Sequence, residues 1–143
     1  MINEVVYLVP EDNILEQVRG QFAKKIFILA RREPNAPGNH AFLAKVLSAT
    51  EVQLDRDAAL VLADAGTLLS LLPVMHQKHP EKILVFGFVP EEIGLRVNAP
   101  LYKPFLFYQS TWLFADALSE LEPDRTLKGH LWTALKQIFL SND

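Results

Sequence analysis

The chain of 143 residues contains no cysteine. This absence excludes disulfides, thiolate nucleophiles and cysteine-based zinc sites, and it fits a reducing cytoplasm. No apolar run approaches the roughly 18 residues of a membrane span, because Asp64, Gly66 and Pro73 interrupt residues 60–74. The first residues also lack the basic head and apolar run of a signal peptide. We therefore expect a cytoplasmic protein with no membrane partner.

Basic charge and glycine are both in short supply. The 14 lysines and arginines are outnumbered by 17 acidic residues, which leaves a net charge of −3 at pH 7. Sequence-independent binding to a phosphate backbone needs clustered basic residues, so DNA is expected to be at most a weak partner. The six glycines form neither a Gly-x-Gly-x-x-Gly nor a Walker loop. No nucleotide cofactor is predicted.

Candidate metal and nucleophile residues are isolated. His76 and His79 lie three residues apart, but a metal site needs three or four ligands and no further ligand has suitable spacing. His40 and His130 are each alone, and no Gly-x-Ser-x-Gly elbow is present. The sequence predicts no metal, no cofactor and no conventional nucleophilic centre.

The remaining pattern predicts a single α/β domain. Half of the residues are hydrophobic, and the length fits one core. Apolar runs at residues 25–30, 58–63 and 82–87 are typical of buried parallel strands, and residues 101–113 are expected to form a fourth strand. A further short strand is expected at residues 5–9. Strands that alternate with helices predict a three-layer α/β/α fold around a mostly parallel, four-stranded sheet.

Helix boundaries follow from capping residues. Asp12 is expected to cap a helix that Gly20 ends, and Asn39 one that contains residues 42–47. A leucine-rich helix is expected at residues 66–76, and a short one opens at Pro90. Asp124 is expected to cap the last helix. Its apolar stripe comprises Leu127, Leu131, Trp132, Leu135, Ile138 and Phe139.

Two groups of residues are candidates for binding. Arg31 and Arg32 follow a predicted central strand, at the edge where open α/β sheets commonly bind ligands. In the aromatic segment, Phe105 and Phe107 are expected in the core. The aromatic residues out of phase with these two are expected at a partner interface, because such side chains are enriched in binding hot spots. These are Tyr102, Tyr108 and Trp112.

A motif near the C-terminus resembles the uracil-DNA glycosylase superfamily. In its four- and five-type branches, a His-Pro-Ser-x-Leu loop precedes Asn-Pro-x-Leu-Lys and a helix with Leu-Trp. The residues that match in register are Ser119, Leu121, Leu127, Lys128, Leu131 and Trp132. The catalytic His of the family falls on Ala117, and its other active loop, Gly-Glu-x-Pro-Gly, falls at residues 30–34, where Glu33 and Pro34 remain. The resemblance covers about residues 25–140.

The resemblance implies a glycosylase-like fold without glycosylase chemistry. That chemistry requires a group that stabilises the departing base, and Ala117 carries no hydrogen-bond donor on its side chain. The psi subunits of the bacterial replicative polymerase share this core without its catalytic residues. Residues 26–30 with 39–49, 88–104 and 124–142 are similar to them. Psi subunits join the chi subunit to the clamp loader, so the similarity implies a clamp-loader or other replisome protein as partner.

Three functions follow as hypotheses. The first is a non-catalytic protein-interaction module of glycosylase-like fold, similar to a psi subunit. The second is a divergent enzyme acting on DNA bases or nucleotides, with Glu33 and Ser119 in its site. The third is a nucleic-acid-binding domain that keeps the groove, with Arg31 and Arg32 at its edge.

Overall fold

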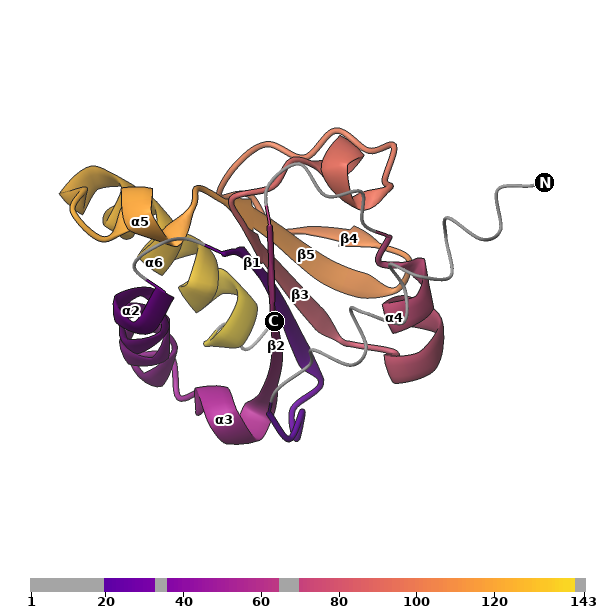
Figure 1. The fold of residues 1–143 in the computed structure, drawn as a ribbon, viewed down its shortest axis with the longest axis horizontal. Helices are drawn as coiled ribbons and strands as arrows, with labels where there is room; N and C mark the ends of the chain where they lie inside the picture. Colours follow the sequence, from indigo (N-terminus) through magenta and orange to yellow (C-terminus); the bar gives the residue numbers. More distant parts are fainter. Residues whose placement is uncertain (1–19, 33–35, 65–69, 141–143) are drawn as a thin grey trace.

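The computed structural model describes residues 20–32, 36–64 and 70–140 (Figure 1). The strand expected at residues 5–9 and the helix expected after Asp12 lie outside these ranges. Along the described chain the elements are β1 (Ile26–Arg31), α2 (Ala36–Ser48), α3 (Leu54–Asp57), β2 (Ala58–Ala63), α4 (Leu72–Lys78), β3 (Lys82–Phe86), the 3-10 helix η1 (Pro90–Ile93), β4 (Phe105–Phe107), β5 (Ser110–Ala115), α5 (Leu118–Leu121) and α6 (Arg125–Phe139).

The described strands form one mixed sheet in the order β2-β1-β3-β5-β4. β1 pairs in parallel with β2 and β3, and β3 pairs in parallel with β5. β4 runs antiparallel to β5 at the edge of the sheet. The protein is therefore an α/β protein with a mostly parallel sheet, as expected, but the sheet has five strands rather than four.

The additional strand arises because residues 101–113, predicted as one strand, contain a hairpin. Phe107 pairs with Ser110, so the turn consists of two residues, Tyr108 and Gln109. Both have positive φ angles, 53° and 65°. Two-residue hairpin turns of this kind usually carry Asn-Gly or Asp-Gly. Because Tyr108-Gln109 carries no such signal, the position of the reversal is not predicted from the residues.

The two faces of the sheet bury different sets of side chains. On β1, Ile26, Ile28 and Ala30 belong to one apolar cluster, while Phe27 and Leu29 belong to the other. This alternation is the normal two-residue period of a strand. Helices α2, α3, α5 and α6 contribute to the first cluster, and α4 and η1 contribute to the second (Figure 1). Helices thus lie on both faces of the sheet.

The helix boundaries are partly as expected. Asp124 caps α6, since its Oδ1 accepts a hydrogen bond from the Leu127 amide at 3.0 Å. By contrast, α2 begins at Ala36, so Asn39 is buried inside the helix and is not its cap. The earlier start is possible because Pro37 lies in the first turn, where a missing amide hydrogen costs nothing. No helix in the described ranges is both long and apolar enough to cross a membrane.

Candidate functional site

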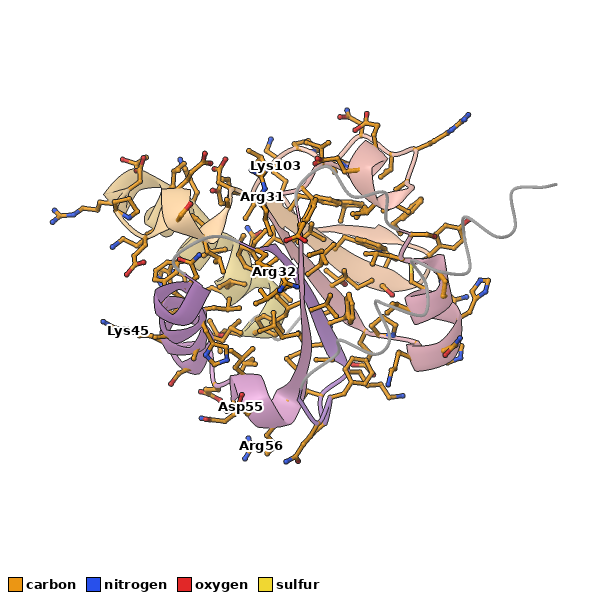
Figure 2. The ribbon with its side chains drawn as sticks, in the orientation of Figure 1. Arg31, Arg32, Lys45, Asp55, Arg56 and Lys103 are labelled. Atoms are coloured by element: carbon orange, nitrogen blue, oxygen red, sulfur yellow. The ribbon has the colours of Figure 1, made fainter. Side chains whose placement is uncertain are left out.

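The two arginines at the carboxyl edge of the sheet bind to the protein itself. Arg31 donates from Nε and Nη2 to the Gly87 carbonyl, at 3.0 and 2.6 Å. Arg32 donates to the Leu62 carbonyl at 3.0 Å, and its Nε lies 3.2 Å from the Asp64 carboxylate. Figure 2 places Arg31 at the end of the sheet, beneath the loop that carries Lys103. Both side chains therefore tie neighbouring strand ends together.

Ala117, which the resemblance to glycosylases aligns with a catalytic histidine, is packed against this same edge of the sheet. Gly87 has a φ of 88°, and a Cβ added to it would lie 3.1 Å from the Cβ atoms of both Ala117 and Arg31. Ala117 is itself buried. The structure thus brings Arg31, Gly87 and Ala117 together, and a larger side chain at Gly87 would be crowded by the other two residues. Ser119 is exposed on the following helix, α5, and Glu33 lies outside the described residues.

A histidine does approach this region, but the space beside it is small. His40 of α2, together with Arg31 and Leu118, lines a cavity of about 20 Å³. That volume is close to the space occupied by one water molecule, whereas ligand pockets commonly measure about 300–1,000 Å³. As far as the described residues define it, this cavity does not accommodate a nucleobase.

Tyr102, expected at an interface, is bonded within the fold. Its hydroxyl donates to the Asp116 carboxylate at 2.5 Å, and its ring lies 5.7 Å from that of His130. Burial, together with the adjacent Asp116 carboxylate, raises the pKa of the Tyr102 hydroxyl. This hydroxyl therefore stays protonated and fixes the loop before β4 to the end of β5.

Trp112 and Tyr108 differ from each other in exposure. Trp112 is 0% exposed, and its Nε1 donates to the Phe107 carbonyl at 2.8 Å, so its expected role at a partner interface is wrong. Tyr108 is 62% exposed at the tip of the hairpin, where its ring contacts that of Phe107. The structure does not bring the three predicted interface aromatics onto one surface.

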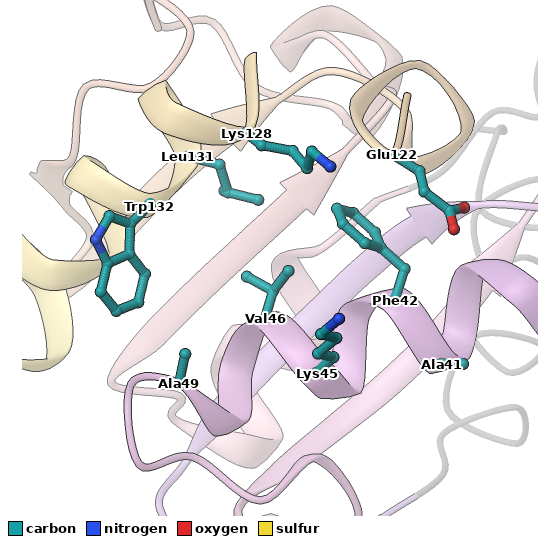
Figure 3. A pocket seen from close by; sticks show the side chains of 9 residues that line it. All are labelled: Ala41, Phe42, Lys45, Val46, Ala49, Glu122, Lys128, Leu131 and Trp132. Carbon is teal, nitrogen blue, oxygen red and sulfur yellow. The ribbon is translucent and has the colours of Figure 1, made fainter. Parts of the chain in front are cut away.

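A groove between α2 and α6 has a volume of about 710 Å³. Its lining is mainly apolar, and Phe42 and Val46 of α2 point into it, toward Leu131 of α6 (Figure 3). Trp132 lies at one end and Glu122 at the other (Figure 3). The remaining lining residues are Ala41, Lys45, Ala49 and Lys128. We take this groove as the candidate functional site.

Two lysines, Lys45 and Lys128, line the groove, and Lys136 lies beside it. Lys128 lies four residues before Trp132 on α6, and Lys136 lies four residues after it, with its Nζ 5.4 Å from the centre of the Trp132 ring. Lys45 projects outward from α2 (Figure 2). No hydrogen bond or ion pair joins the side chain of Lys45 or Lys128 to another residue that the structure describes. The groove is thus locally basic in an acidic chain.

The groove is not predicted from the sequence when Trp132 is counted in the buried stripe of the last helix. At about 100° per residue, Trp132 lies at the outer edge of that stripe, well away from Leu127 and Ile138. In the structure Leu131 and Leu135 are buried, whereas Trp132 is half-buried. Its angular position, with lysines four residues to either side, was the available signal.

Metal ligands do not gather in the described part of the chain. No group of three or more His, Asp or Glu side chains in it is placed to hold an ion, and His76 and His79 are exposed around the end of α4. No family model matches the chain, and no curated protein matches it at a significant level.

Proposed function

We propose that this chain is a non-catalytic protein-interaction module of glycosylase-like fold, and that it acts as a psi-like accessory subunit of the replicative polymerase and its clamp loader in the cytoplasm. The observation that carries the proposal is the groove between α2 and α6. It exposes part of Trp132 over an apolar floor. A half-buried tryptophan beside an apolar hollow is the usual composition of a protein-binding hot spot.

The carboxyl edge of the sheet supports a function other than catalysis. Ala117 offers only a methyl group where the resemblance places a histidine, and that methyl packs toward Gly87. The guanidinium of Arg31 is bound to the Gly87 carbonyl rather than directed at a ligand. An enzyme that stabilises a departing base needs a preorganised donor with room for the base. The described residues at this edge provide little of either.

The fold is consistent with the same proposal. Four parallel strands with helices on both faces are what a glycosylase-like domain requires, and β4 adds an antiparallel edge strand to them. The resemblance also depends on Lys128, Leu131 and Trp132 of α6. Leu131 is buried, whereas Lys128 and Trp132 line the groove. Part of the shared motif therefore contributes to the surface that we propose for binding.

Affinity capture tests the proposed function. The tagged full chain, expressed in its native cell, should co-purify with clamp-loader or other replisome subunits identified by mass spectrometry. The same protein should release no uracil from a uracil-containing oligonucleotide. Uracil release that Glu33→Ala abolishes would establish the enzyme hypothesis and overturn the proposal. Salt-dependent binding of single-stranded DNA, lost when Arg31 and Arg32 are both replaced by alanine, would instead favour a nucleic-acid-binding domain.

A further inference from the structure

We infer that the groove between α2 and α6 binds an acidic amphipathic helix of a partner protein. The inference rests on the proposed function and specifies the chemistry of the partner. It depends on three features of the groove: its length, the position of its lysines, and the lysine that covers one face of the Trp132 ring.

The length of the groove fits two turns of a helix. Its lining on α2 and the residue that follows it extends from Ala41 to Ala49, a span of nine residues that rises about 12 Å along the helix axis. Helices that bind in grooves insert apolar anchors at positions i, i+3 or i+4, and i+7, which span about 10 Å. Alanines at both limits of the α2 lining leave room for bulky anchors, and Phe42 and Val46 form the floor between them.

The lysines determine the charge of the partner. Lys128 and Lys136 flank Trp132 on α6, and Lys45 lies on α2. Glu122, at one end, is the acidic residue of the groove lining. Because the whole chain carries a net charge of −3, this excess of positive charge is local. Carboxylates beside the apolar anchors of a bound helix would meet these lysines and would favour that helix over a basic one.

The same features favour a peptide over a nucleic acid. Lys136 lies over the Trp132 ring, so one face of that ring already has a partner and is not available for a stacked base. Aliphatic side chains such as Val46 and Leu131 offer a helix apolar contact but offer a base no stacking surface.

Selection from a library of random 16-residue peptides on the full-length chain tests the inference. We expect the enriched peptides to combine apolar residues at helical spacing with an excess of Asp and Glu. A synthetic copy of the strongest binder should bind at least tenfold more weakly to the Lys45→Glu, Lys128→Glu double variant. It should also bind about tenfold more weakly to Trp132→Ala, while Trp132→Phe retains most of the affinity.

Control variants separate the groove from general charge. The Lys78→Glu, Lys103→Glu double variant makes the same change in net charge at exposed positions outside the groove lining, and its affinity should stay within about twofold of wild type. Circular dichroism and thermal unfolding verify that every variant is folded. The Lys45→Ala, Lys128→Ala double variant removes the charges without reversing them, and it should show a smaller loss in the same direction.

Several results would overturn the inference. These are failure to enrich any peptide, enriched peptides without acidic excess, and equal binding by the groove variants. Binding of a 20-residue oligothymidylate that the groove variants lose would assign the groove to nucleic acid. Concentration-dependent dimers that Trp132→Ala abolishes would assign it to a second copy of this chain. If wild-type and groove variants capture the same clamp-loader subunits, the inference fails while the proposed function stands. If wild type captures none, the proposed function fails, whatever the peptides show.

Discussion

The two tryptophans of the chain lie in contrasting surroundings. Trp112 is enclosed in the sheet, with its ring 6.1 Å from that of Phe114 and 6.0 Å from that of Phe107, and its ring nitrogen bonded to a backbone carbonyl. Trp132 lies at the end of an open groove on α6, with a lysine ammonium above it. From the sequence we expected the opposite, with Trp112 at an interface and Trp132 in the buried stripe of the last helix.

The hairpin turn decides the position of Trp112. In one continuous strand, Phe105 and Phe107 would share a face, and Trp112 would lie on the other. The two-residue turn pairs Phe105 directly with Trp112, and directly paired residues point to the same face. Trp112 therefore joins Phe105 and Phe107 in one apolar cluster, while Leu106 on the opposite face of the edge strand is 76% exposed.

The largest expected difference is in stability. Trp112→Ala should lower the free energy of unfolding by about 3–5 kcal/mol, because a fully buried aromatic side chain leaves a cavity. Trp132→Ala should lower it by only about 1 kcal/mol, because its ring contributes mainly to the surface of the groove. Urea unfolding followed by circular dichroism measures both values. Equal losses would mean that Trp132 is part of the core and would end the contrast.

The arginines at the sheet edge extend the comparison to charged residues. Arg31→Ala should cost about 2 kcal/mol, since it removes two charge-assisted hydrogen bonds to the Gly87 carbonyl. Arg32→Ala should cost less than about 1 kcal/mol, because its pairing with Asp64 is exposed to solvent. The shift in urea midpoint of each variant, at constant slope, tests this order. A stable Arg31→Ala protein with altered ligand binding would return Arg31 to the list of binding residues.

Low pH should lower the free energy of unfolding through Asp57, which lies on the side of the sheet that carries the groove. Asp57 of α3 is buried there, and the hydrogen bond from Arg56 lowers the pKa of its carboxyl to about 2. Because the folded pKa lies below the unfolded value, the stabilisation is complete above about pH 4 and is lost as pH falls toward 2. Stability should fall by about 1–2 kcal/mol over this range. Asp57→Asn should show a smaller slope, measured by urea unfolding at a series of pH values.

Local residue patterns predicted the central part of the fold well. The apolar runs that contain β1, β2 and β3 are uninterrupted, so each strand lies close to its predicted residues. Asp124 caps α6 as predicted because its short side chain is suited to that position. The candidate site was less accessible to sequence reasoning. Whether Trp132 faces the core or a groove depends on how far α2 lies from α6, and neither helix specifies that distance alone.

The turn that encloses Trp112 gives the smallest expected effect. Gln109 has a φ of 65°, a left-handed conformation that costs an ordinary residue about 1–2 kcal/mol. Gln109→Gly should therefore raise the free energy of unfolding by up to about 1 kcal/mol, since glycine tolerates positive φ but loses more backbone entropy on folding. The same substitution at Gln77, inside α4, should lower stability by about 1 kcal/mol, because glycine is a poor helix former. Urea unfolding of the two variants provides a matched pair with opposite signs. A loss of stability at both positions would mean that the chain reversal before β5 does not depend on this left-handed turn. The inward orientation of the Trp112 side chain would then not depend on it either.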